Sequence, residues 1–368
     1  MRNEPTIIDL SQGWALEDSR RSRCHSEAEL TATSNVLWGD CGDPARRADR
    51  IRQFATTTGS ASVLIADVAA RQMQTLYRHS SSVMKSVVRT RKNIPNYNSV
   101  EATRFEGAES TLPLVKENGE YPQITVSQEQ TERYFVGKHG ALFEATEESI
   151  TNDPVGVFNT LPERMVRGAL RSEEAFMTSL FFDAGGPIDA FYSAQPSGPS
   201  SLPLTIDNLA TAVGQMLGYT DTEGDPIISM PKFLMVGPGL MIKAMQLLNS
   251  ISLNHVVDGS GSGPGVAESH GTKNVLSDLG IKLLVNPWIP VLSTSGTIGS
   301  TCWSLFTDPA NIPAGEFGTL VGYDAPQVSA PDARDIKRIQ TDVLTWKVKH
   351  VFGGTRLDPR AVWGSFGQ

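Results

Sequence analysis

The sequence predicts an α+β protein with four successive parts. These are an N-terminal arm without periodic structure, a long projecting β-hairpin, one very long helix, and a mixed domain of short helices and strands. Three observations carry this prediction. An Asn-Gly pair separates two extended runs, a helical stripe of apolar residues continues for about 30 residues, and short segments of alternating type follow residue 204.

Composition limits the class of protein before any motif is considered. The chain has 368 residues, of which 39% are hydrophobic and 20% charged, so it can bury a sizeable core. No run approaches the ~18 apolar residues of a membrane-spanning helix, and residues 1–12 lack the apolar centre of a secretory signal. Three cysteines cannot all pair, which favours a reducing cytosol. We therefore expect a soluble protein without a membrane partner.

The arm spans residues 1–58 and has too few paired apolar positions to form a core of its own. Residues 1–100 carry 14 Lys and Arg against 10 Asp and Glu, whereas residues 101–200 carry 7 against 16. We expect contacts outside its own fold to order the arm, either with an acidic surface of another copy or with nucleic acid. In the third interpretation, the charged residues form solvated faces and bind no partner. The arginines expected to make these contacts are Arg20, Arg21, Arg23, Arg46, Arg47 and Arg50.

A first helix is predicted over residues 61–88, and a long hairpin over residues 101–144. Asn118-Gly119 is typical of a tight hairpin turn, and Pro113 and Pro122 exclude a central strand near the tip. Arms of about 15 residues at ~3.3 Å each reach ~50 Å. A two-stranded ribbon is marginal in water, so we expect the tip to rest on a neighbouring subunit. The tip residues are Leu114, Val115, Lys116, Glu117, Asn118, Gly119, Glu120 and Tyr121.

The long helix is predicted over residues 153–182. Asp153-Pro154 provides an N-cap followed by proline at the first helical position, and Gly185-Gly186 ends the periodic pattern. Apolar residues recur at helical spacing along one face. The opposite, polar face is expected to carry Glu163, Arg167, Arg171 and Glu174.

The mixed domain begins near Leu204. Helices are predicted over residues 206–216 and 238–248. Compact apolar runs predict strands over residues 231–236, 282–285, 303–306 and 345–352, and a Gly/Ser-rich loop covers residues 258–265.

No catalytic constellation is present in the sequence. The loop Gly259–Gly265 is interrupted by Pro264, and Gly271-Thr272-Lys273 inverts the order that a phosphate-binding loop requires. Cys24, His25 and Cys41 lack a fourth metal ligand. Glu144, Glu147 and Glu148 indicate a helix-entry or solvated cluster and not an acid–base pair. We therefore expect no enzymatic activity, no cofactor and no metal.

The order of these parts resembles the major capsid proteins of tailed bacteriophages, which share the Johnson (Hong Kong 97-like) fold, and the local sequence resembles the Mu-like branch. The resemblance covers roughly residues 60–368. The motifs that carry it are Pro231–Val236 with Leu247–Ser250, Asn274–Leu276 through Val285–Pro287, Trp303–Pro309, and Trp346–Gly353 with Asp358–Ala361.

This resemblance implies an E-loop over residues 101–135, a spine helix over 153–182 and an axial domain over 203–330. The peripheral domain then comprises residues 59–100, 136–202 and 331–368. Some family members join subunits by a Lys–Asn isopeptide bond. Lys116 and Asn311 have the required residue types, but no glutamate can be placed as catalyst, so we do not expect the bond here.

The resemblance also implies a function. The chain is expected to self-assemble into pentamers and hexamers of an icosahedral head shell around packaged double-stranded DNA, which it contacts non-specifically. A portal, a separate scaffolding protein and a cement protein are the implied partners, with assembly in the host cytoplasm and a final location in the virion capsid. Two alternatives remain: an encapsulin-like nanocompartment shell, and a nucleotide-binding enzyme that uses the Gly259–Gly265 loop.

Overall fold

The computed structural model describes most of the chain after residue 81 and divides it into two compact units. One unit comprises Met1–Ser80, Lys138–Leu170 and Ala325–Val351; the other comprises Ser81–Gly137, Arg171–Asp324 and Phe352–Gln368. The six arm arginines and most of the predicted first helix lie outside the described residues. The described residues are Tyr77, 82–106, 114–117, 119–121, 127–146, 148–149, 161–194, 198–220, 224–250, 252–256, 269–329 and 340–367.

The end of the predicted first helix differs from the expectation. Tyr77 is helical, and within the described residues 82–88 the chain forms a short 3-10 helix, η1 (Met84–Ser86), before strand β1 (Arg89–Ile94) begins. The Val87 amide donates to the Met84 carbonyl at 3.0 Å, a tighter turn than an α-helix makes. This turn places Met84, Val87 and Val88 together in a buried cluster.

A mixed sheet forms one part of the second unit. β1 pairs in parallel with β12 (Gly315–Leu320), and β12 pairs antiparallel with the last residues of β14 (Val343–Arg356). Every residue of β12 is buried. Because successive side chains of a strand point to opposite faces, Phe317 enters the buried cluster with Met84, while Glu316 and Gly318 point to the other face.

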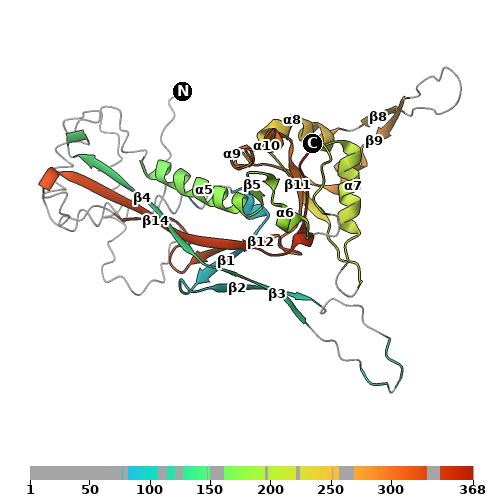
Figure 1. Ribbon diagram of the computed structural model, residues 1–368, viewed down its shortest axis with the longest axis horizontal. Coiled ribbons are helices and arrows are strands. Elements are labelled where there is room, and N and C mark those ends of the chain that lie inside the picture. Colours follow the sequence, from blue (N-terminus) through green and yellow to red (C-terminus); the bar gives the residue numbers. More distant parts are fainter. Residues whose placement is uncertain are drawn as a thin grey trace, which may run out of the picture. The chain divides into compact units, whose positions relative to one another are not determined.

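The projecting hairpin is confirmed near its base, where β2 (Val100–Glu106) pairs antiparallel with β3 (Ser127–Tyr134) (Figure 1). The remainder of each arm toward the tip, residues 107–113 and 122–126, lies outside the described residues, and the second arm does not continue to residue 144. Instead, β4 (Gly137–Thr146) is a separate strand that pairs with β14 in the first unit. Pairing within a larger sheet is more stable than extending a lone ribbon.

The predicted long helix corresponds to α5 (Leu161–Ser179). Residues 150–160 lie outside the described residues, and the helix ends three residues before the predicted position 182. The chain then forms the short pair β5 (Phe182–Asp183) and β6 (Gly186–Pro187), where the Asp183 side chain accepts from the Gly185 amide at 2.8 Å. This turn buries Phe181 and Phe182, which explains the earlier helix end.

A four-stranded sheet forms the other part of the second unit, in the order β10 (Lys282–Val285), β7 (Pro231–Val236), β11 (Trp303–Thr307) and β15 (Val362–Ser365). β10 and β7 are parallel, and the other pairs are antiparallel. The strands predicted at 231–236, 282–285 and 303–306 are confirmed, whereas β15 was not predicted.

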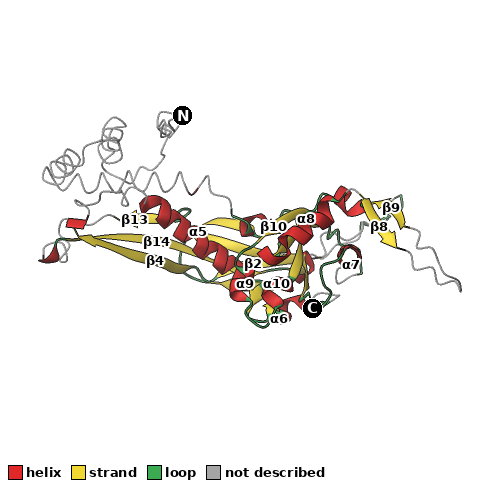
Figure 2. Cartoon of the chain, turned by 90° about the horizontal axis from the view of Figure 1, so that it is seen from above, coloured by secondary structure: helices red, strands yellow, loops and turns green. Residues whose placement is uncertain are grey.

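Helices α7 (Ile206–Leu217) and α8 (Met241–Asn249), the latter preceded by η3 (Pro238–Leu240), also match the predicted segments. Beyond α8, β8 (Ser252–Val256) pairs with β9 (Ser269–Lys273) (Figure 2). The predicted loop at 258–265 lies outside the described residues. The remaining short elements of this unit are α6 (Asp189–Tyr192), η4 (Val275–Leu279), α9 (Ile289–Leu292), α10 (Ile298–Thr301) and η5 (Pro359–Ala361).

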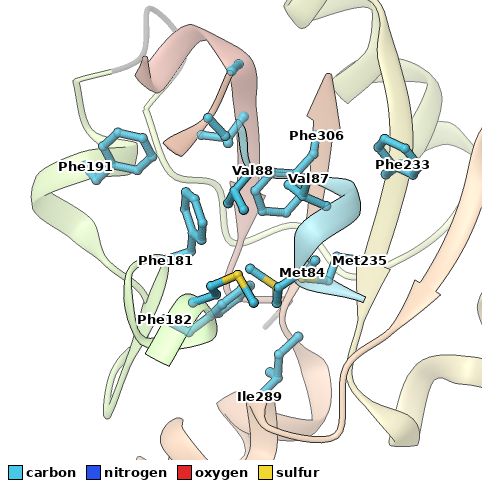
Figure 3. Packing of buried hydrophobic residues seen from close by; sticks show 14 of the residues in the cluster. Met84, Val87, Val88, Phe181, Phe182, Phe191, Phe233, Met235, Ile289 and Phe306 are labelled. Atoms are coloured by element: carbon cyan, nitrogen blue, oxygen red, sulfur yellow. The ribbon is translucent and has the colours of Figure 1, made fainter. Parts of the chain in front are cut away.

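Two apolar clusters hold the second unit together. The first surrounds η1, where Met84, Val87 and Val88 lie among Phe181 and Phe306 (Figure 3). The second lies beside α7 and centres on Trp303 and Trp363, both fully buried, with ring centroids 4.8 Å apart. Large buried aromatic residues of this kind each contribute several kcal/mol to stability.

In the first unit, β14 lies between β4 and β13 (Gln327–Ser329). The rings of Phe143 on β4 and Trp346 on β14 pack 5.7 Å apart. β14, which runs from Val343 to Arg356, is longer than the strand predicted over residues 345–352. Among the described helices of the chain, none is long and apolar enough to cross a membrane.

Candidate functional site

The root of the β2–β3 hairpin gathers several polar side chains around one buried carboxylate. Glu316 on β12 is fully buried, and Arg89 is its register partner on β1. Arg89 Nε donates to Glu316 Oε2 at 2.9 Å, and Arg89 Nη2 contacts the same oxygen. Tyr134 Oη donates to Oε1 at 2.8 Å, and Arg91 Nη1 lies 3.4 Å from Oε1. We call these four residues the root cluster.

The root cluster holds both strands of the hairpin. Tyr134 is the last residue of β3, and Arg91 Nη1 also donates to the backbone carbonyl of Glu101 on β2 at 3.1 Å. Burial, and next the Glu316 charge, raise the pKa of Tyr134, so the phenol remains a proton donor. One carboxylate is thereby linked to β1, β2, β3 and β12.

Two glycines leave space for the hairpin root on this face of the sheet. A Cβ atom at Gly318 would lie 2.5 Å from Ile94 Cδ1 and from Tyr134 Oη. Gly353, its register partner on β14, faces the backbone of Phe135, whose carbonyl oxygen a Cβ atom would overlap. The absent side chains therefore let the chain pass closely over the sheet as it leaves β3.

An exposed ion pair crosses the hairpin beside the root cluster. Arg133 Nη2 lies 2.8 Å from Glu101 Oε1, and the side chains are 67% and 52% exposed. Exposed pairs contribute ~0–1 kcal/mol. This pair therefore adds little to the anchoring that Glu316 provides.

At the predicted tip, Leu114 and Tyr121 are 95% and 87% exposed. The Gly119 amide donates to the Lys116 carbonyl at 2.8 Å. The turn therefore lies one residue earlier than an Asn-Gly centred turn, and glycine takes its last position, which type I turns favour. Asn118 lies outside the described residues. Lys116 and Asn311 are both exposed.

The predicted polar face of α5 is only partly as expected. Arg167 and Arg171 are exposed, but Glu174 is half-buried, because its Oε2 accepts from the Met84 amide at 3.2 Å. The side chain of Glu163 lies outside the described residues.

Sequence reasoning missed Glu173, which is fully buried and lies 2.5 Å from Lys85 Nζ. Helical spacing carried the signal. Glu173 is three residues after Leu170 and four before Met177, which places it within the apolar stripe.

Other groups offer little chemistry in the part of the chain described. No cluster of three or more His, Cys, Asp or Glu side chains there could hold a metal ion. Cys302 is buried, and burial raises the pKa of its thiol to about 12, so it stays protonated. A pocket of about 170 Å³ beside α8 is lined mainly by apolar residues: Met245, Leu248, Asn249, Leu276, Ser277, Ile281 and Leu283.

Comparisons with known proteins give one family and several solved structures. A family model described as phage capsid protein matches residues 129–365. A structure of Microbacterium phage Oxtober96 has 13% identity and a TM-score of 0.48, covering 78% of this chain and 91% of that one. The capsid structure of cyanophage P-SCSP1u has 12% identity and a TM-score of 0.47, covering 77% and 88%.

A third similar structure is the virus-like particle from Pyrococcus furiosus. It has 14% identity and a TM-score of 0.44, covering 81% of this chain and 98% of that one. A search of curated proteins gives no match.

Proposed function

We propose, because this chain belongs to the phage capsid protein family, that it is the major capsid protein of a tailed bacteriophage. It self-assembles into pentamers and hexamers that form the icosahedral head shell around packaged double-stranded DNA. In this proposal, residues 101–135 are the E-loop, residues 203–330 the axial domain, and the peripheral domain comprises residues 59–100, 136–202 and 331–368.

The hairpin tip is the observation that supports self-assembly. Leu114 and Tyr121 are large apolar side chains on either side of the hairpin turn, and both are almost fully exposed in the single chain. Burying such a side chain gains ~1.5–3 kcal/mol, a gain that a second copy would provide in every repeat of a closed shell. The tip is therefore proposed as a contact between subunits.

The partners in this proposal follow from the family and from charge. The arm arginines contact either the acidic 101–200 segment of a neighbouring copy or DNA, and DNA contacts are non-specific. The other proposed partners are a portal, a separate scaffolding protein and a cement protein. Assembly of the head takes place in the host cytoplasm. Removing residues 1–50 should give shells that dissociate at lower salt than full-length shells, as measured by light scattering.

Assembly of the purified protein tests the proposal. We expect closed shells by negative-stain electron microscopy, and we expect the variant lacking residues 115–120 to remain folded but to assemble poorly. The double variant Leu114→Ser/Tyr121→Ser should behave like the deletion, whereas Lys116→Ser, at an exposed polar position of the same tip, is the matched control. Normal, equally stable shells from the deletion and the double variant would contradict the tip contact.

Shells isolated from cells, together with ligand binding by the soluble subunit, separate the alternatives. Shells filled with protein cargo would support the encapsulin-like nanocompartment, whereas shells produced during phage infection that contain DNA support the capsid. Micromolar binding of ATP or NAD to the soluble subunit would favour the nucleotide-binding enzyme.

A further inference from the structure

We infer that the root cluster sets the direction of the β2–β3 hairpin, and that Arg91 and Tyr134 are positioning residues for its contact with a second copy. This inference rests on the proposed function, because it assigns a role to the hairpin as an assembly contact. It goes beyond that function by locating the control of assembly geometry at the root of the hairpin, away from the contacting tip.

Connectivity is the first argument. Tyr134 donates to Glu316 at 2.8 Å from the end of β3, and Arg91 joins the same carboxylate to the Glu101 carbonyl on β2. Arg89 holds the other carboxylate oxygen at 2.9 Å from the adjacent strand β1. The two hairpin strands are thus fixed to one point on the sheet, and a rotation of the hairpin would separate Tyr134 from Glu316 or the Glu101 carbonyl from Arg91.

The burial of Glu316 is the second argument. The Glu316 side chain is 1% exposed, whereas those of Arg89 and Arg91 are 45% and 48% exposed. A buried carboxylate is strongly disfavoured when its partners are removed, while half-exposed guanidinium groups remain solvated. The carboxylate therefore restricts the hairpin to orientations in which the donors of its root stay in reach.

Leverage is the third argument. The seven residues of β2 extend about 23 Å at ~3.3 Å per residue, so a 10° rotation at the root displaces the end of the strand by about 4 Å. Interfaces pack as closely as protein interiors, and such a displacement would remove the contact. Gly318 and Gly353 keep the root close to the sheet, because a Cβ atom at either position would meet Tyr134 or Phe135.

Hydrogen exchange on the soluble subunit tests the root cluster directly. The variants are Tyr134→Phe, which removes one donor and keeps the ring, and Glu316→Gln, which removes the charge and keeps the shape. We expect both to exchange the amides of residues 100–106 and 127–134 at least tenfold faster than the unmodified subunit. The matched control, Glu101→Gln with Arg133→Gln, removes the exposed pair of the same hairpin and should change exchange less than twofold.

Unchanged hairpin exchange in the folded Tyr134→Phe subunit would overturn the inference, and this variant decides the matter if Glu316→Gln does not fold. Electron microscopy then tests the link to assembly. If unmodified subunits form shells, Tyr134→Phe should give fewer or irregular shells; a normal yield of normal diameter, despite faster exchange, would refute the positioning role. If unmodified subunits form no shells, the proposed function fails, while the exchange result still decides whether the root cluster orients the hairpin.

Discussion

Replacing Gly353 by alanine tests how closely the hairpin root lies on the sheet. The new Cβ atom would lie 3.0 Å from the carbonyl carbon of Phe135 and from the Cα of Val136, and closer still to the Phe135 oxygen, where ordinary contacts are 3.4–4 Å. These are backbone atoms, so no side-chain rotation relieves the overlap. Overpacking of this kind costs about 1–3 kcal/mol, and we expect the melting temperature to fall by roughly 2–10 °C.

Gly214 in α7 provides the matched control. A Cβ atom there meets nothing within 4 Å, so Gly214→Ala should raise stability by about 0.5–1 kcal/mol through helix propensity. Thermal unfolding followed by circular dichroism measures both variants. If Gly353→Ala were as stable as the unmodified protein, the Phe135 backbone would not be seated against β14 and the close approach would be wrong.

Three further variants test other parts of the fold. Trp363→Ala should destabilise the protein by about 3–5 kcal/mol, because it removes the contact with Trp303 and the 2.8 Å hydrogen bond to Gln215; a loss below 1 kcal/mol in urea unfolding would argue against that core. Lys85→Met should lower the free energy of unfolding by about 3–5 kcal/mol, because it removes the ammonium group that pairs with the buried Glu173 carboxylate. Glu173→Gln in the same background should restore part of this loss. Burial raises the pKa of the Cys302 thiol from 9.0 to about 12, so its contribution to the free energy of unfolding is fully present below pH 9 and is lost as the pH rises toward 12. Cys302→Ala should therefore reduce the fall in the free energy of unfolding between pH 9 and pH 12. An unchanged slope over this range would contradict the raised pKa of the thiol.

The phage capsid resemblance is confirmed by the family match, and the predicted α+β class is confirmed by the mixed helix-and-strand architecture. The Mu-like branch stays a prediction. Strands such as β7 and β10 were predictable because short apolar runs with flanking Pro, Gly or Asn give a local signal. β12 was not, because Gly315 and Gly318 weaken the strand pattern and the charged Glu316 is its second residue.

The candidate site was harder to predict because its contacts are distant in sequence. Glu316 meets Arg89 and Tyr134 across more than 180 residues, and no local pattern distinguishes such a carboxylate from a solvated one. The helical spacing of Glu173 within the apolar stripe predicts that its side chain is buried. The sequence does not show which cation pairs with it, because Lys85 is distant along the chain. The base of the hairpin was predicted and its turn was placed one residue too late, whereas the separation of β4 depended on pairing with β14.

The late position of β15 in the chain has a consequence for biosynthesis. Val362–Ser365 pairs with β11 at one edge of the four-stranded sheet, and Trp363 completes the apolar cluster around Trp303. Until the ribosome has released these residues, β11 presents unpaired amides and carbonyls, a surface on which other chains can add. A nascent subunit therefore cannot complete this sheet early, and stalled or truncated chains carry an open edge that favours aggregation over ordered growth of a shell.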